Sequence, residues 1–164
     1  MTEGVLIKIG MADLNVGSGG AILRTTGLGS CVGLTLYDAQ LKIGGMAHIM
    51  LPSSEIAREG QLNVAKYADT AVPELIGLLK GRGASIARLV AKIAGGAQMF
   101  AFAGGSDTMR IGPRNVEATK LALSRIGIPL VAEDTGGNYG RTVELNSENG
   151  SFSIRSVQFG VKEI

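Results

Sequence analysis

The chain has 164 residues, of which 45% are apolar and 18% charged, with a net charge of +2. This composition excludes an intrinsically disordered protein, which combines low hydrophobicity with high net charge. The length fits a single domain, residues 1–164. The longest charge-free stretch, residues 93–106, is shorter than the roughly 20 apolar residues of a membrane span, so no membrane insertion is expected. Scattered basic residues and only 4% aromatic residues argue against nucleic-acid binding.

One cysteine and one histidine limit the available chemistry. A single cysteine forms no internal disulfide, which fits a reducing, cytoplasmic compartment. The N-terminal residues carry neither the basic nor the apolar segment of a secretory signal. So few potential ligands predict no metal site, and we expect no cofactor.

The first third of the chain alternates short apolar runs with glycines. This pattern predicts strands at residues 5–9 and 21–25. Two further strands are predicted at residues 31–37 and 42–51, joined by a turn at residues 38–41.

The middle of the chain has helical periodicity. Apolar residues at three- and four-residue spacing predict a helix over residues 67–80, with Pro73 in its first turn. Strand periodicity returns at residues 88–94. A second helix is predicted over residues 116–126, ended by Gly127.

The last third returns to strands, at residues 130–133, 141–145 and 152–154. Asn149-Gly150 indicates a hairpin between the last two, and a shift in apolar parity after Ile154 predicts a β-bulge. Strands, then two helices, then strands predict an α+β fold. We expect a single layered sandwich of mixed or antiparallel β-sheet with two main helices.

Cys31 and His48 flank the predicted turn at residues 38–41. If that loop has an even number of residues, two at positions 39–40 or four at positions 38–41, the cysteine lies directly opposite the histidine on one face of the hairpin. Facing Cβ atoms lie ~4.5–5.5 Å apart. We therefore expect the sulfur to lie within about 4 Å of a ring nitrogen.

A thiol beside an imidazole is a nucleophile beside a base, and their ion pair would keep a reactive thiolate populated near neutral pH. The amides of Ser30 and Cys31 are candidates for binding an oxyanion, and Gly29 lets the backbone approach a substrate. Thr25 or Thr26 offers a group to orient the ring. The pattern predicts metal-free acyl transfer. The alternative is that the cysteine is a small buried hydrophobe and the histidine a core residue.

Three further residues are candidates for a substrate groove. Arg114 and Asn115 stand at the start of the second predicted helix, where Asn115 alternatively caps it. Asn138 lies in the turn-rich segment 134–140, which is expected to form a turn first and a groove wall second. The Gly-rich segment 95–105 lacks a phosphate-loop ending, so nucleotide binding is not expected.

The chain also resembles the CheD family of bacterial chemotaxis proteins over about residues 5–160. The motifs that carry the resemblance are residues 25–32, 47–52, 91–100, 111–115, 134–137 and 140–141. This family consists of chemoreceptor glutamine deamidases. The resemblance implies a cysteine-hydrolase fold shared with deamidating bacterial toxins. It also implies a catalytic triad of Cys31 as nucleophile, His48 as base and Thr25 as third member.

The resemblance further implies a reaction and partners. Glutamine side chains on the cytoplasmic helices of chemoreceptors would become glutamates, with release of ammonia through a thioester, and the same chemistry would cleave a glutamyl methyl ester. The phosphatase CheC would be a protein partner. The alternative is a non-catalytic chemotaxis regulator that acts by binding CheC or receptors.

Overall fold

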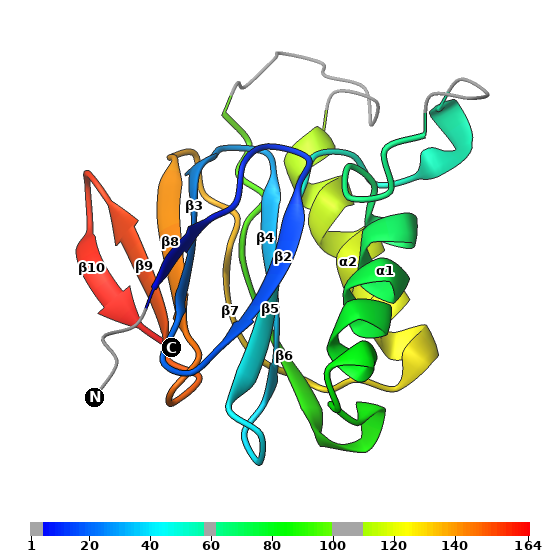
Figure 1. Cartoon of the computed structure of the whole chain (residues 1–164). Helices are drawn as coiled ribbons and strands as arrows, with labels where there is room; N and C mark the ends of the chain where they lie inside the picture. The colour runs from blue at the N-terminus through cyan, green and yellow to red at the C-terminus, as the bar shows by residue number, and fades with distance from the viewer. Residues whose placement is uncertain (1–4, 58–61, 100–109) are drawn as a thin grey trace.

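The computed structural model describes residues 5–57, 62–99 and 110–164, which form two five-stranded sheets and a pair of helices stacked in three layers (Figure 1). The first sheet has the order β1 (Leu6–Lys8), β3 (Ile22–Leu28), β8 (Arg141–Asn146), β9 (Phe152–Ser156) and β10 (Gly160–Glu163). The second has the order β2 (Leu14–Ser18), β5 (Ile43–Ile49), β4 (Val32–Asp38), β6 (Leu89–Gly95) and β7 (Leu130–Thr135). The helices are α1 (Ala68–Gly81) and α2 (Ile111–Ile126), and single 3-10 turns are η1 (Ser54–Ile56) and η2 (Ile86–Arg88).

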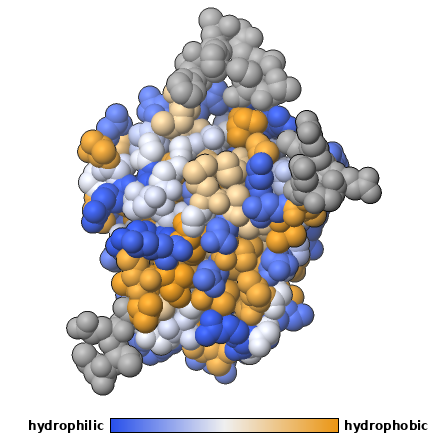
Figure 2. Space-filling view, turned by 45° about the horizontal axis from the view of Figure 1, so that its top comes forward, coloured by the Kyte–Doolittle hydropathy of each residue, from blue (hydrophilic) through white to orange (hydrophobic). Residues whose placement is uncertain are grey.

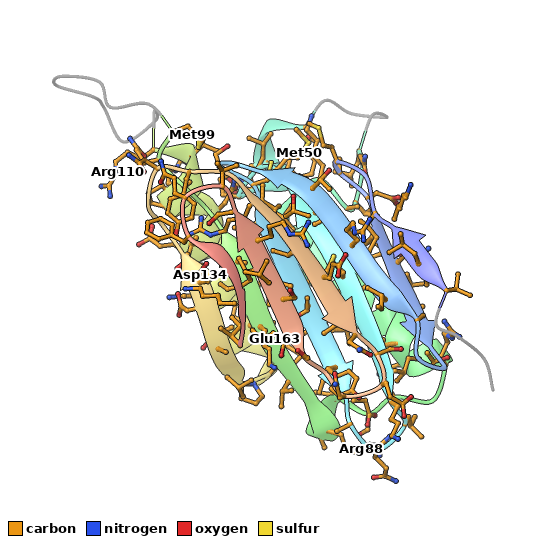
Figure 3. All side chains as sticks on the ribbon, turned by 90° about the vertical axis from the view of Figure 1, so that its left-hand side faces the viewer. Met50, Arg88, Met99, Arg110, Asp134 and Glu163 are labelled. Carbon is orange, nitrogen blue, oxygen red and sulfur yellow. The ribbon has the colours of Figure 1, made fainter. Side chains whose placement is uncertain are left out.

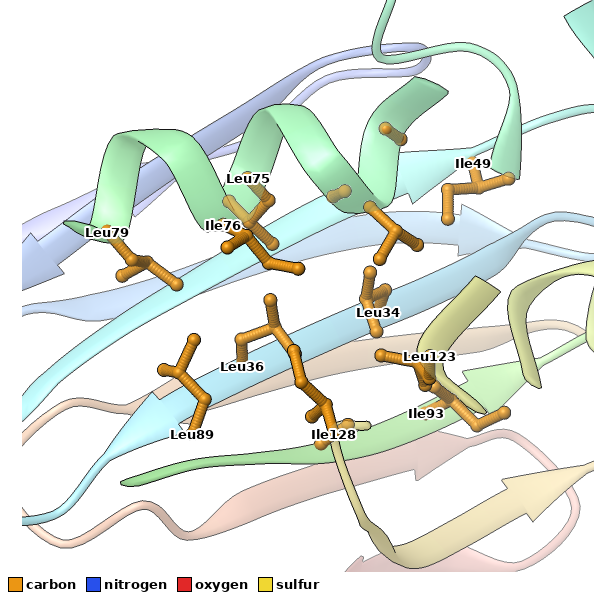
Figure 4. Packing of buried hydrophobic residues seen from close by; sticks show 14 of the residues in the cluster. Leu34, Leu36, Ile49, Leu75, Ile76, Leu79, Leu89, Ile93, Leu123 and Ile128 are labelled. Atoms are coloured by element: carbon orange, nitrogen blue, oxygen red, sulfur yellow. The ribbon is translucent and has the colours of Figure 1, made fainter. Parts of the chain in front are cut away.

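The second sheet is the central layer, and every residue of β4 and β5 is buried. The core between this sheet and the helices includes Leu34, Leu36, Leu75, Leu79 and Leu123 (Figure 4). The core between the two sheets includes Leu23, Met46, Val143, Phe152 and Ile154. Each fully buried leucine contributes about 1.5–3 kcal/mol relative to an exposed one. The central strands are therefore held from both faces.

The α+β class is confirmed, and the strands are divided between two sheets rather than joined in one. Each strand predicted from the sequence corresponds to a strand of the structure, and the Asn149-Gly150 hairpin joins β8 to β9. Two strands lie outside the predicted set. β2 is a sheet edge whose Asn15 and Gly17 interrupt the apolar pattern. The bulge predicted after Ile154 is wrong, because β9 continues to Ser156 and a tight turn then leads into β10.

Both helices differ in detail from the sequence prediction. Pro73 is the sixth residue of α1, beyond the first turn. α2 begins at Ile111 and not at residue 116, because Pro113 occupies its first turn, where proline is tolerated. Gly127 ends α2 as predicted, with a left-handed φ of 89°. Neither α1 nor α2, the two helices of the described residues, has the length and hydrophobicity that a membrane-spanning helix needs.

Candidate active site

The candidate catalytic residues lie at one end of the two sheets, where β3 and β5 end and β4 begins (Figure 1). Met50, the first residue after β5, lies at this end with Met99, while Arg88 lies at the opposite end (Figure 3). Connections between elements meet here, and Cys31 lies on one of them, directly before β4.

A β-bulge shapes β3 just before the nucleophile candidate. Thr25 pairs with Val143 and Leu28 pairs with Arg141, so β3 carries one extra residue between these pairs. Gly27 has φ +71°, a conformation that favours glycine. Thr25 and Leu28 are consequently both buried, while the intervening residues are exposed. Thr25 thus continues the inward alternation begun by Leu23, and the extra residue of the bulge lets Leu28 be buried as well.

The hairpin register differs from the prediction by two residues. His48 faces Gly33 and not Cys31. The loop comprises residues 39–42, one residue later than expected, because the Asp38 carboxylate accepts hydrogen bonds from two amides of the loop. The loop is still even, so the predicted face is kept. Cys31 packs against the core between the sheets, the side on which His48 also lies.

His48 is fixed by a hydrogen bond to Thr25. Its Nδ1 lies 2.7 Å from the Thr25 Oγ1, which also lies 2.8 Å from the Ile9 carbonyl oxygen. The hydroxyl has one proton, and a carbonyl only accepts, so the hydroxyl donates to Ile9 and accepts from the Nδ1–H. The neutral ring therefore presents an unprotonated Nε2. Thr26, by contrast, is exposed.

Both members of the candidate pair are neutral at rest. Burial lowers the pKa of His48 and raises the pKa of the Cys31 thiol. Nε2 is buried and has no hydrogen-bond partner among residues 5–57, 62–99 and 110–164, so the close Cys31–His48 hydrogen bond expected from the sequence is not formed. The expected ion pair is therefore replaced by a thiol and a free imidazole base. Such contacts commonly tighten only when substrate binds.

The loop that carries the cysteine is held through its carbonyl groups. The Ala97 amide donates to the Gly29 carbonyl and the Gly96 amide donates to the Cys31 carbonyl, each at 2.8 Å. Asn115 Nδ2 donates to the Ser30 carbonyl at 2.9 Å. Three consecutive carbonyls are thus fixed by three different donors.

Two amides of this loop are candidate donors to a ligand. In a trans peptide the N–H points opposite to the preceding carbonyl, so the fixed carbonyls also fix the amides of Ser30 and Cys31. Neither amide donates a hydrogen bond to another residue of the described part of the chain. The Gly29 amide, by contrast, donates to the Gly27 carbonyl. Adjacent free donors of this kind can hold an oxyanion, so Ser30 and Cys31 fit that role better than Gly29.

Gly95 permits the close packing behind the cysteine. It has φ +105°, and a Cβ atom there would lie 2.2 Å from the Cys31 carbonyl oxygen. No side chain fits this position without moving the Cys31 peptide.

Gly95→Ala is therefore expected to lower the rate of Cys31 acylation by about 10²-fold. This is the cost of misplacing a reacting group by roughly 1 Å. The rate of Cys31 acylation, measured with circular dichroism to confirm folding, checks this. Gly77→Ala is the matched control, because a Cβ there meets nothing within 4 Å. Equal activity of the two variants would contradict the packing argument.

Of the three groove candidates, one contacts the cysteine loop. Asn115 is buried in the second turn of α2 and donates to the carbonyls of Ser30 and Met50, so it neither caps the helix nor lies exposed to a ligand. Arg114 is exposed and borders a hollow of about 450 Å³. Asn138 is exposed and lines a separate hollow of about 530 Å³ on the first sheet.

A buried arginine supports the site from the other side. Arg141 binds Asp134, the Gly136 carbonyl and the Tyr139 hydroxyl, which holds the turn between β7 and β8. In that turn the Gly136 amide donates a hydrogen bond to the Gly95 carbonyl, and Gly95 directly precedes the residues that fix the cysteine loop. The sequence could have indicated this residue, because Arg141 alternates in step with the buried apolar residues of β8.

Comparison with known proteins gives one consistent family. A family model described as CheD chemotactic sensory transduction matches residues 50–156. The protein named "Chemoreceptor glutamine deamidase CheD" from Halalkalibacterium halodurans is 55% identical over 159 residues, which are 97% of this chain and 98% of the relative. The protein of that name from Bacillus subtilis is 48% identical over 163 residues, 99% of this chain and 98% of the relative. A protein named "Probable chemoreceptor glutamine deamidase CheD" from Geobacillus kaustophilus is 52% identical over 165 residues, the full length of both.

Proposed function

This chain belongs to the CheD family, and from that membership we propose that it is a protein-glutamine deamidase that converts glutamine side chains of chemoreceptors to glutamate. The observation that carries the mechanism is the hydrogen bond between His48 Nδ1 and Thr25, which leaves Nε2 free to act as a base. The nucleophile is Cys31. The glutamines that it modifies lie on the cytoplasmic helices of the chemoreceptor.

The first half-reaction forms a thioester. Sγ of Cys31 attacks the side-chain carbonyl carbon of the glutamine, and the thiol proton passes to His48 Nε2. The carbonyl oxygen becomes an oxyanion, which the amides of Ser30 and Cys31 stabilise. The carbon–nitrogen bond then breaks, and the imidazolium returns the proton to the departing nitrogen as ammonia.

The second half-reaction releases glutamate. A water molecule attacks the thioester while His48 Nε2 removes its proton, and the oxyanion forms again at the same amides. The carbon–sulfur bond breaks, and the thiolate recovers its proton from the imidazolium. The same sequence of steps on a glutamyl methyl ester releases methanol.

The surface around the site fits a protein substrate. The His48 amide donates to the Asp13 carbonyl and the Met50 amide to the Lys66 carbonyl, so segments 11–13 and 62–66 flank the end of β5. Hydrophobic side chains are exposed between hydrophilic ones in the view that brings this end forward (Figure 2). Exposed apolar side chains near the site are Met11, Leu62, Val64 and Met99. Exposed apolar groups rimmed by polar ones are typical of protein-binding surfaces.

The function is tested by incubating a purified receptor cytoplasmic fragment with this protein. Deamidation replaces an amide NH₂ by OH, and mass spectrometry of peptides locates each modified glutamine. Ammonia release in equal amount is the second readout. A receptor fragment whose glutamines and methyl esters both stay unchanged would refute the proposal.

We also propose CheC as a protein partner, on the basis of family membership. Adding CheC to the same deamidation assay should change the rate in proportion to complex formation. An unchanged rate and the absence of a complex in ultracentrifugation would argue against this partner.

Thr25→Val is expected to slow deamidation by about tenfold or more, because the ring loses the acceptor that fixes its tautomer. The variant keeps the side-chain shape but leaves the Ile9 carbonyl without its donor, which costs about 1–3 kcal/mol of stability. Deamidation rates and urea unfolding measure the two effects. Thr26→Val is the control, since Thr26 is exposed. A larger loss of activity in the Thr26 variant would reverse the assignment.

A further inference from the structure

Asn115 makes two hydrogen bonds that have no part in the reaction steps proposed above. Its side chain is fully buried, and Nδ2 donates to the carbonyl oxygens of Ser30 and Met50, both at 2.9 Å. Its Oδ1 is also buried and has no partner within the residues that the structure describes. Burying an unpaired oxygen is costly, so stability alone does not explain an asparagine here.

The two carbonyls lie just outside the paired ends of β4 and β5, beside Cys31 and two residues from His48. The last residue pair between β4 and β5 is Val32 with Ile49. Ser30 and Met50 lie just beyond that pair, where ladder hydrogen bonds have ended. The Asn115 side-chain amide connects the two segments at this point, where backbone hydrogen bonds between β4 and β5 have ended.

α2 is a firm support for this bridge. Near its beginning, Gly112 packs so closely that a Cβ atom would lie 2.1 Å from the Ala97 carbonyl oxygen. A Cβ atom on Gly96 would lie 2.2 Å from Val116 in the next turn. The helix therefore contacts the segment that also donates to the carbonyls of Gly29 and Cys31.

The bridge determines where one amide points. The Ser30 carbonyl and the Cys31 N–H belong to the same trans peptide and point in opposite directions. We propose that Asn115 is a positioning residue that holds the Ser30–Cys31 peptide so that the Cys31 amide faces the oxyanion formed at the reacting carbonyl. This inference rests on the proposed role of Cys31 as nucleophile, and it adds the residue that pre-organises its oxyanion site.

Two reactions of Cys31 separate this role from a general effect on the thiol. p-Nitrophenyl acetate acylates the sulfur: attack at the ester carbonyl forms an oxyanion, and p-nitrophenolate leaves. Iodoacetamide alkylates the sulfur by displacing iodide at a saturated carbon, with no oxyanion. Both release the thiol proton. Only the first reaction depends on the direction of the Cys31 amide.

Asn115→Ala is expected to slow acylation about tenfold or more while alkylation changes by less than about twofold, because loss of one oxyanion donor costs roughly 10²–10³ in rate. Asn115→Asp keeps the side-chain shape but removes the Nδ2 donors. We expect it to change the two rates in the same way as Asn115→Ala. Thr119→Val is the matched control, because Thr119 is buried one turn along α2 and its hydroxyl, among the residues that the structure describes, donates to the Asn115 backbone carbonyl alone. Cys31→Ala supplies the background rate.

A parallel fall in acylation and alkylation would overturn the proposal, since the thiol itself would then be displaced. Unchanged acylation, or a fall equal to that of Thr119→Val, would also overturn it. If neither Asn115 variant folds, the residue supports the whole fold and the specific role is refuted. The ester assay needs no receptor, so its result is independent of whether the wild-type protein deamidates the receptor fragment.

Discussion

Cys31→Ala is expected to abolish deamidation, with a loss of about 10⁴-fold or more, because the chain offers no other thiol on which the thioester could form. This is the only cysteine of the chain. Its side chain is partly buried at the edge of the core between the sheets, so removing one sulfur atom leaves a small change in packing. Mass spectrometry of the receptor fragment after incubation with each protein measures the rates.

Binding of the receptor fragment is the internal control for this variant. Since the alanine keeps the backbone and the surrounding surface, Cys31→Ala should still bind the fragment with nearly the wild-type affinity. A variant that restores full chemotactic signalling in cells without deamidating the fragment would favour the non-catalytic regulator that binds CheC or receptors. The two outcomes separate the enzyme from the binding module.

Periodicity was sufficient for the strands and helices that pack on a core. The alternation in β8 and the helical spacing in α1 report which face is buried, and both elements lie where they are predicted. β2 and β10 are edge strands of their sheets, and β10 is exposed throughout. Neither carries a buried apolar alternation, because every residue of β10 is exposed and the buried residue of β2 is a glycine, Gly17. The number of sheets was not predictable either, since periodicity does not say which strands pair.

The candidate site was predictable in part from the scarcity of residues. The chain has one cysteine and one histidine, and an even loop between their strands puts both side chains on the same face. The register differs from the prediction by two residues, which leaves that face unchanged. The register itself depends on Asp38, whose carboxylate sets where the loop begins. The role of Asn115 was hidden because Gly112-Pro113 resembles a helix break. Helix α2 tolerates both residues in its first turn.

The charge state of the pair could not be predicted from residue types. A cysteine beside a histidine suggests a thiolate, but burial disfavours both charged forms. Burial depends on the second sheet and its core, which the sequence pattern did not reveal as a separate layer. In the proposed mechanism a neutral thiol loses its proton during attack, which requires a base close to the sulfur.

His48→Ala is expected to lower deamidation by about 10²–10⁴-fold, because attack and departure of ammonia both need proton transfer. In the wild-type protein the active form of His48 is neutral. Burial sets its pKa below the ordinary value, so activity should persist to a lower pH than an exposed histidine would allow. Activity is then lost as the pH falls through that lowered pKa.

The pH dependence of alkylation distinguishes a base from a merely buried ring. Without His48, only the spontaneous thiolate of Cys31 reacts, and burial keeps the pKa of this thiol above its ordinary value. The alkylation rate of His48→Ala should therefore be low at neutral pH and rise about tenfold per pH unit toward alkaline pH. The wild-type rate should already be near its plateau at neutral pH, because the base accepts the proton there. Iodoacetamide labelling of both proteins across this pH range, followed by mass spectrometry, measures the two profiles. Superimposable profiles would mean that His48 does not accept the proton of Cys31, and the proposed base would have to be another group.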